Sequence, residues 1–279
     1  MQTFLPYPDV ARSADVLDDR RLGKQRVETL QILRALCLEG YGWASHPAVT
    51  MWRGHVPALV GYGIAVVDAW VHRGFADTTR ALIAEFVHPD APAGADELVT
   101  AGVLPPWWGD PALHRSHRSA LIRKDPVHYG AAFAGEPGGP PSDDLPYVWP
   151  DPPAPPAARG RRSAWVVRGS ASPSGVALDA GPDESAWIPL DARSGRILKR
   201  HRQVARLVDE MAHGDLLVVP DGGHLRLGRV AGPYRYADGR HHRPVEWTGV
   251  LARAALRFPA ALQDPQAVFS LHDEPRLGG

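Results

Sequence analysis

The densest polar stretch of the sequence, residues 17–28, reads LDDRRLGKQRVE. On a helix, its polar side chains recur three and four residues apart and share one face: Arg21, Lys24, Gln25 and Glu28, with Asp18 one turn earlier. Such a face offers cations to phosphates and a carboxylate to a reacting centre. A solvated amphipathic helix with ion pairs explains the same spacing, so both interpretations stay open.

A second basic stretch, residues 113–126, reads LHRSHRSALIRKDP, and six of its fourteen residues are His, Arg or Lys. Arginine forks separated by serine hydroxyls suit phosphate oxygens, so we interpret this stretch as a helix that contacts DNA phosphates. A cluster of structural ion pairs is the alternative. The spacing of His114 and His117 can hold a metal ion. No third ligand of matching quality accompanies them, so we expect no metal and no cofactor.

Helical periodicity dominates the first half of the chain and must position both stretches. We expect one helix from an N-cap at Ser13 to about residue 38, followed by helices over about 46–70, 77–87 and 111–124. The proline- and glycine-rich residues 136–161 interrupt regular structure. We therefore expect a helical domain over residues 1–150, a proline-rich linker over 151–162 and a second domain over 163–279.

The second half changes to strand-like patterning. We expect strands over 164–168, 215–219 and 225–230 and another beginning at 242, with Gly222-Gly223 as a hairpin turn and one helix over 199–212. Several short strands with one or two helices predict a small closed or half-closed β-barrel. The expected fold class is thus α+β in two domains, all-α in the first and a small β-barrel in the second.

Composition limits the class of protein. The 279 residues carry no net charge, so any DNA-binding surface must come from local clusters. The single cysteine, Cys37, leaves no internal disulfide and no thiolate metal cluster. No apolar run approaches the ~20 residues that cross a bilayer, and the first residues lack a secretory signal pattern. We expect no membrane partner and a cytoplasmic location.

Residues 1–150 resemble the endonuclease V-type pyrimidine-dimer DNA glycosylases. The likeness rests on five segments together, namely 17–28, 46–52 (HPAVTMW), 106–110 (PWWGD), 114–126 and 146–150 (PYVWP). The second-helix stretch from His46 to Phe75 is also similar. The combination is similar to a divergent bacterial branch of that family. It implies an all-α endonuclease V-like domain that flips a base, or its partner, out of double-stranded DNA.

The resemblance also implies a mechanism. In this family a free amine attacks C1′ and displaces the base, and a carboxylate assists. An α-amine suits this role because its usual pKa is near 8, against about 10.4 for lysine. Here the bulky Gln2 favours retention of Met1, and the position of the family's catalytic glutamate falls near Gly23 or Arg21, neither of which is an acid. We therefore expect Met1 or Lys24 as the amine.

The expected site residues follow from these arguments. Asp18 or Glu28 is the expected acid/base partner, and Lys124 is a further candidate amine. The expected catalytic residues are Met1, Asp18, Arg21, Lys24, Gln25 and Glu28. The expected DNA contacts are Arg20, Arg26, His46, His55, His114, Arg115, His117, Arg118, Arg123 and Lys124.

Residues 163–272 resemble the PUA-like, EVE-type domains that read modified bases. The likeness rests on residues 165–170, 214–220, 227–236 and 242–247 in that order. It implies a pocket for a flipped modified base, which needs flat rings for stacking and polar groups for its edge. The expected pocket residues are Ser170, Trp187, Asp215, Tyr234, Tyr236, Arg243 and Trp247. A packed core of aromatic side chains is the alternative.

The two resemblances together imply a DNA glycosylase, with or without AP-lyase activity, that acts on double-stranded DNA carrying a damaged or modified base. Repair and phage defence both fit, and fold-level analogy favours defence. The main alternative is a non-catalytic protein that binds nucleic acid. A metal-dependent nuclease is a third possibility, but the sequence offers no convincing carboxylate cluster.

Overall fold

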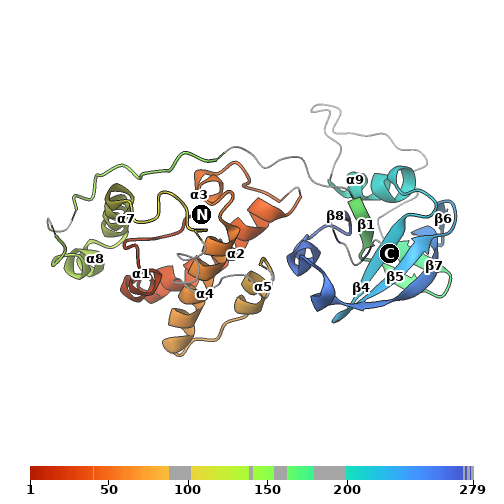
Figure 1. Cartoon of the computed structure of the whole chain (residues 1–279), viewed down its shortest axis with the longest axis horizontal. Coiled ribbons are helices and arrows are strands. Elements are labelled where there is room, and N and C mark those ends of the chain that lie inside the picture. The colour runs from red at the N-terminus through yellow and green to blue at the C-terminus, as the bar shows by residue number, and fades with distance from the viewer. Residues whose placement is uncertain are drawn as a thin grey trace. The chain divides into compact units, whose positions relative to one another are not determined.

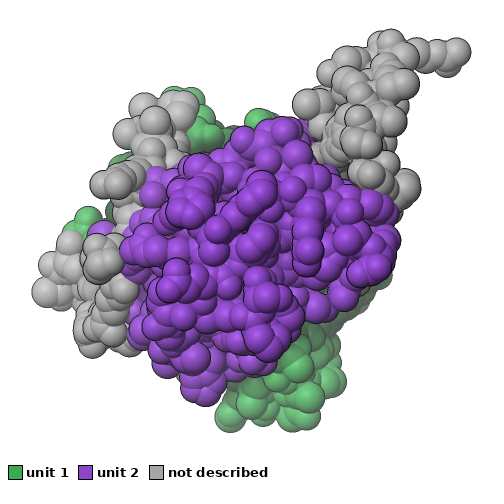
Figure 2. Space-filling model, turned by 90° about the vertical axis from the view of Figure 1, so that its right-hand side faces the viewer, with its two compact units in different colours: residues 1–157 green, residues 158–279 purple. Residues whose placement is uncertain are grey.

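The computed structural model describes residues 1–39, 41–87, 102–137, 141–153, 162–178, 199–272, 274 and 277. The chain forms two compact units, Met1–Ala157 (unit 1) and Ala158–Gly279 (unit 2), which are coloured separately in Figure 2. In its described part, unit 1 contains helices and no strand, whereas unit 2 contains the sheet, so the fold is mixed α and β. Within the described residues, no helix is both long and apolar enough to cross a membrane.

Unit 1 is built from helices (Figure 1). They are α1 (Val10–Val16), α2 (Asp19–Cys37), α3 (Pro47–Thr50), α4 (Val56–His72), α5 (Arg80–Ala84), α7 (Pro111–Lys124) and α8 (Pro126–Ala132). Helices α2 and α4 pack against each other. They approach closely because Gly63 faces α2, where a β-carbon would lie only 2.7 Å from Cγ2 of Thr29.

The single helix expected from Ser13 to about residue 38 is wrong. Two helices, α1 and α2, take its place, because Leu17 and Asp18 adopt extended backbone between them. The side chain of Asp9 accepts the N-cap hydrogen bond of α1, and the side chain of Asp18 accepts that of α2. The helix expected over 46–70 is likewise divided into α3 and α4, with Gly54 at φ +80° between them.

Unit 2 is an open sheet with short helical segments. Its strands are β1 (Arg162–Val167), β2 (Ser170–Ser172), β3 (Gly175–Leu178), β4 (Leu216–Asp221), β5 (His224–Val230), β6 (Arg235–Ala237), β7 (Arg240–Ala252) and β8 (Val268–His272). Helix α9 (Lys199–Ala205) continues into a π-helical turn, Arg206–Glu210, and 3-10 turns cover Arg253–Ala255 and Pro259–Gln263. The strand order is β2-β3-β7-β5-β4-β1-β8, and β6 pairs with β7.

A closed or half-closed barrel was expected for unit 2, and its closed form is wrong. The sheet ends at β2 on one side and at β8 on the other, and these two edge strands do not pair. Both faces of the inner strands are covered, because Trp165 and Val167 of β1 belong to one apolar cluster and Ala164 and Val166 to another. Burial on two faces explains the continuous apolar run of this strand, which pairs with β4 in parallel. The expected hairpin at Gly222-Gly223 is confirmed between β4 and β5.

Candidate active site

The first seven residues form no helix or strand, and residues 3–7 are buried within unit 1. The backbone N–H of Phe4 donates to Oε1 of Gln25 at 2.8 Å, and the N–H of Leu5 donates to Nδ1 of His117 at 2.8 Å. The carbonyl of Leu5 lies 2.7 Å from Nδ1 of His114. Helices α2 and α7 therefore hold this segment from two sides, and the position of its amino group is set by their side chains.

Three side chains of the basic stretch on α7 contact the N-terminal segment. His114 and His117 are buried, and Arg118 is half-buried and donates to the carbonyl of Pro6 at 2.6 Å. Burial places the two histidine rings out of reach of DNA phosphates. These three side chains therefore hold the N-terminal segment, and their burial argues against the DNA contacts expected of them. Burial lowers the pKa of His114 and lowers that of His117 well below its ordinary 6.5.

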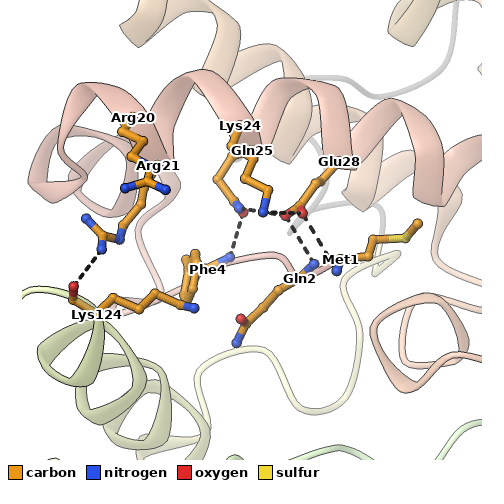
Figure 3. A pocket seen from close by; sticks show the side chains of 9 residues that line it. All are labelled: Met1, Gln2, Phe4, Arg20, Arg21, Lys24, Gln25, Glu28 and Lys124. Atoms are coloured by element: carbon orange, nitrogen blue, oxygen red, sulfur yellow. Dashed lines mark hydrogen bonds and ion pairs between the residues drawn. The ribbon is translucent and has the colours of Figure 1, made fainter.

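Four nitrogens of the N-terminal segment and α2 surround the carboxylate of Glu28 (Figure 3). The amino group of Met1 lies 3.7 Å from Oε1, and Nζ of Lys24 lies 3.4 Å from the same oxygen. The backbone N–H of Gln2 donates to Oε2 at 3.2 Å, and Nε2 of Gln25 donates to it at 3.3 Å. Glu28 is only 7% exposed, so this carboxylate is buried among donors.

Gln25 is held by a hydrogen-bond network that fixes its orientation. Its Oε1 lies 2.8 Å from the N–H of Phe4 and 2.7 Å from the hydroxyl of Tyr62. Both groups are donors, so the oxygen must face them and Nε2 must face Glu28. The hydroxyl of Tyr62 also lies 3.1 Å from the carbonyl of Phe4. Tyr62 of α4 therefore supports the carboxylate through Gln25.

These residues open into a cationic pocket of about 400 Å³, which we name the Glu28 pocket. Its lining consists of Met1, Gln2, Phe4, Arg20, Arg21, Lys24, Gln25, Glu28 and Lys124. Among these described residues, the lining contains four cationic side chains, one amino group and a single carboxylate. Nη2 of Arg21 donates to the carbonyl of Lys124 at 2.9 Å, so α2 and the end of α7 meet at the pocket.

Asp18 is the one expected catalytic residue outside the pocket lining. It caps α2, pairs with Arg21 at 2.6 Å and accepts a hydrogen bond from the hydroxyl of Tyr129. Burial alone would raise the pKa of Asp18, but the hydrogen bonds from Tyr129 and Arg21 outweigh it and lower that pKa. This carboxylate stays ionised and occupied, so Glu28 is the better candidate for the acid/base group.

The remaining residues expected to contact DNA are dispersed. Arg26 pairs with Asp77 at 2.7 Å, and Arg123 donates to the carbonyls of Asp143 and Leu145. Nδ1 of His55 lies 3.4 Å from the carbonyl of Val103. Arg115 is half-buried on α7. None of these four expected residues lines the Glu28 pocket.

His46 caps α3, because its Nδ1 accepts from the N–H of Ala48 at 3.1 Å. Partial burial lowers the pKa of His46 most, the positive amino group of Met1 lowers it further, and the carboxylate of Glu28 opposes both. This histidine is therefore near enough to the Glu28 pocket to sense its charges.

In unit 2, the expected base-pocket residues divide by role. Arg243 is buried and donates to the carbonyls of Leu207, Val208, Met211 and Gly232, which makes it a structural residue. Asp215 accepts from the indole N–H of Trp165 at 2.9 Å, a contact within unit 2 that also fixes its position.

The aromatic residues of that set lie on or beside the strands. The hydroxyl of Tyr234 lies 2.9 Å from Nδ1 of His241, and the ring of Tyr236 packs on the same histidine. The indole of Trp247 donates to the carbonyl of Ser172, and the hydroxyl of Ser170 accepts from Arg240. Trp187 lies outside the described residues.

Sequence reasoning missed two supports of the candidate site. Tyr62 lies in an apolar helix and reads as a core residue, and only its hydroxyl signals a polar partner. Gln2 enters through its backbone N–H, which no side-chain pattern can reveal. Within the described residues, no cluster of three or more His, Cys, Asp or Glu side chains could hold a metal ion.

Comparison with known proteins supports the same part of the chain. No curated protein and no solved structure matches the sequence. One family model does match, and its range includes Met1, Lys24, Gln25, Glu28 and Tyr62. Residues 1–82 are thus similar to the family described as pyrimidine dimer DNA glycosylase, which supports a glycosylase that acts on DNA.

Proposed function

We propose that this protein is a DNA glycosylase in which the amino group of Met1 is the nucleophile and Glu28 is its acid/base partner. The observation that carries the proposal is the 3.7 Å approach of the Met1 nitrogen to Oε1 of Glu28 inside a cationic pocket. The family match over residues 1–82 supports a pyrimidine dimer in duplex DNA as the first substrate to test.

The chemistry needs an amine and one carboxylate. The neutral nitrogen of Met1 bonds to C1′, the bond from C1′ to the base breaks, and the base leaves with that electron pair and takes a proton from water. Glu28 accepts the proton that the amine loses and returns it to O4′ as the sugar ring opens. An imine then joins the nitrogen to C1′, and hydrolysis of this imine regenerates the amine.

Strand cleavage would follow from the same groups. If Glu28 removes a proton from C2′ of the imine, the phosphate on C3′ leaves and the strand breaks, which is AP-lyase activity. The cations of the Glu28 pocket would neutralise the flanking phosphates as these reactions proceed. We therefore propose lyase activity as a second outcome of the same intermediate.

Burial favours Met1 over Lys24 as the amine. The side chain of Met1 is 6% exposed, whereas that of Lys24 is 69% exposed and reaches Glu28 from the solvent side. In general an α-amine is about 10% neutral at pH 7, and an ordinary lysine amine is below about 0.1% neutral. Lys24 and Lys124 then bind phosphate.

Borohydride trapping on duplex DNA with an abasic site tests the nucleophile. Reduction of the imine should leave a stable protein–DNA adduct, and peptide mapping should place it on Met1 in a chain whose first residue has been identified by mass spectrometry. Glu28→Gln should lose the adduct, and Glu39→Gln, an exposed glutamate outside the pocket lining, should keep it. An adduct on Lys24 would overturn the choice of amine.

Base release distinguishes glycosylase from binder. Duplexes with a thymine dimer, with a modified cytosine and without either should be incubated with the protein, and the base released should be quantified. The dimer duplex needs photoreversal before this measurement, because the cyclobutane ring still joins the cut base to its neighbour. Release only from the dimer duplex supports the proposal, and release from the modified duplex would redirect it to a modified base. Binding without any release or trapping would replace the proposal with the non-catalytic alternative.

We propose that unit 2 contacts DNA as a reader of a modified base, which would suit defence against phages with modified DNA. The guanidinium of Arg226 lies 4.5 Å from the ring centroid of Trp247, a pairing of cation and ring that suits nucleic acid. Affinity of the full chain for duplexes with and without modified cytosine tests this. Equal affinities, unchanged by Trp247→Ala, would remove the reader proposal.

A further inference from the structure

Four aromatic side chains form a continuous series of ring contacts beside the N-terminal segment. Trp43 and His46 have ring centroids 5.7 Å apart, and His46 and Trp149 have centroids 6.1 Å apart. Tyr147 and Trp149 follow at 4.3 Å. We name this series, Trp43, His46, Trp149 and Tyr147, the aromatic platform.

The outer end of the aromatic platform lies in solvent. Trp43 is 64% exposed and Trp149 is 38% exposed, although both carry large apolar rings. Trp43 also has φ +73°, a left-handed backbone conformation that bulky residues rarely adopt. A strained backbone that holds a large ring in water is unusual for a residue whose role is packing, and strain of this kind gathers at ligand sites.

The inner end of the aromatic platform reaches the candidate active site. The hydroxyl of Tyr147 donates to the carbonyl of Thr3 at 3.3 Å, and its ring stacks on His117, which holds Leu5. His46 is close enough to the amino group of Met1 and to Glu28 for both charges to act on its ring. The exposed rings are therefore continuous with the residues that position the amine.

A nucleophile on Met1 can reach C1′ in a duplex only if a nucleotide leaves the base stack. The extruded base then needs a flat apolar surface, and the Glu28 pocket is lined mostly by charged and polar groups. Aromatic faces offer that surface, and stacking is tolerant of base identity because every base has a π-face. A cationic pocket together with exposed rings that Tyr147 connects to the N-terminal segment suits a nucleotide better than a protein segment.

We propose that the aromatic platform stacks a nucleobase that has left the duplex, with Trp43 and Trp149 as the stacking residues. The inference rests on the proposed function, because it assigns the pairing partner of the attacked nucleotide, or its neighbour in the same strand, to a site that Tyr147 connects to the N-terminal segment. The ligand class is a purine or pyrimidine ring. Trp43 and Trp149 act in binding and take no part in bond breaking.

The test uses a duplex with a tetrahydrofuran abasic analogue, which has no base and cannot form an imine. One duplex carries 2-aminopurine opposite the analogue, and a second carries it as the neighbouring base in the same strand. With the wild-type chain, the 2-aminopurine base should leave the duplex and stack on an indole. This stacking should quench its fluorescence. The duplex that responds identifies which base is extruded.

Trp43→Ala and Trp149→Ala should each weaken binding to the responding duplex about 5- to 100-fold and abolish the quenching. Trp43→Phe keeps an aromatic face and should restore most of the affinity. Phe75→Ala removes an exposed ring that stacks on Trp70 and does not line the Glu28 pocket, so it should change neither quantity. Circular dichroism and the unfolding midpoint of each variant show that the chain is folded.

Unchanged binding and quenching in both alanine variants would overturn the platform. An equal loss of affinity for an undamaged duplex would also overturn it, because it would indicate a general contact with DNA. Binding to the analogue involves no bond breaking. This measurement therefore does not depend on whether borohydride trapping on abasic DNA succeeds. Stacking without trapping would keep the platform and reject the amine mechanism.

Discussion

The backbone N–H of Leu5 donates to Nδ1 of His117 at 2.8 Å, and the two residues are 112 positions apart in the sequence. Since Nδ1 accepts this hydrogen bond, the ring of His117 is neutral and carries its proton on Nε2. That Nε2 is buried without a hydrogen-bond partner in the described part of the chain. The segment that carries the amino group therefore depends on an uncharged histidine.

Acid should destabilise unit 1 through this histidine. Burial, followed by the charge of His114, lowers the pKa of His117 well below 6.5, so the unfolded chain binds more protons than the folded chain below pH 6.5. The stabilisation is complete above about pH 6.5 and is lost as the pH falls towards the lowered pKa. Urea unfolding at pH 7.5 and at pH 5.5 should give a smaller free energy of unfolding at pH 5.5.

His117→Asn provides the control for the pH prediction. Its side-chain carbonyl can accept from Leu5 but does not titrate, so the difference between the two pH values should shrink in this variant. Equal stability of the wild-type chain at both values would contradict the assignment of a neutral buried ring to His117.

Glu28 and Asp18 should differ in their effect on the reaction. Glu28→Gln keeps the shape of the side chain and removes its carboxylate. The single-turnover rate of cleavage of the C1′–base bond should therefore fall by about 10²- to 10⁴-fold. Asp18→Asn keeps a residue that caps helices well, so α2 should start at the same place and the rate should stay within a few-fold of wild type. Similar losses in both variants would return Asp18 to the candidate catalytic residues.

The contact of α2 with Trp70 should be sensitive to a single methyl group. A β-carbon at Gly23 would lie 2.8 Å from the Trp70 ring, so Gly23→Ala should destabilise the chain by about 1–3 kcal/mol in chemical denaturation. A β-carbon at Gly130 in α8 would have no neighbouring atom within 4 Å. Gly130→Ala should therefore be neutral or stabilising by about 1 kcal/mol. A larger loss of stability in Gly130→Ala than in Gly23→Ala would show that α2 and α4 adjust freely to the added methyl group.

Arg243 should act on stability and not on trapping. Arg243→Met leaves the carbonyls of Leu207, Val208 and Met211 without their donor, which should cost about 3 kcal/mol or more in the unfolding of unit 2. Borohydride trapping per folded chain should stay unchanged. Calorimetry tests the expected loss of stability, and trapping on the same preparation tests the expected lack of effect on the reaction. Normal stability with weakened binding to modified DNA would instead support Arg243 as part of a base pocket.

Helical spacing was sufficient to gather the candidate site on α2. Arg21, Lys24, Gln25 and Glu28 were expected on one face, and all four line the Glu28 pocket. The break before α2 was not predictable from periodicity, because the sequence offers cap residues at several positions and the helical pattern continues through Leu17.

The roles of His114 and His117 depend on partners that local sequence does not show. Both contact Leu5, more than a hundred positions earlier, so a pattern typical of a basic surface became a buried support. Whether the expected barrel is closed could not be predicted, for a related reason. Closure depends on whether β2 and β8 meet, and strand patterns specify alternation within a strand but not the partner of an edge strand.

The separation between Leu5 and α7 also has a consequence for biosynthesis. A ribosome releases the first residues long before α7 exists, so the nascent chain can pair α2 with α4 while its N-terminal segment has no α7 to bind. Closing such a long loop adds an entropic cost that only the completed unit repays. We expect the amine to reach Glu28 late in synthesis, so that an unfinished chain is inert towards DNA.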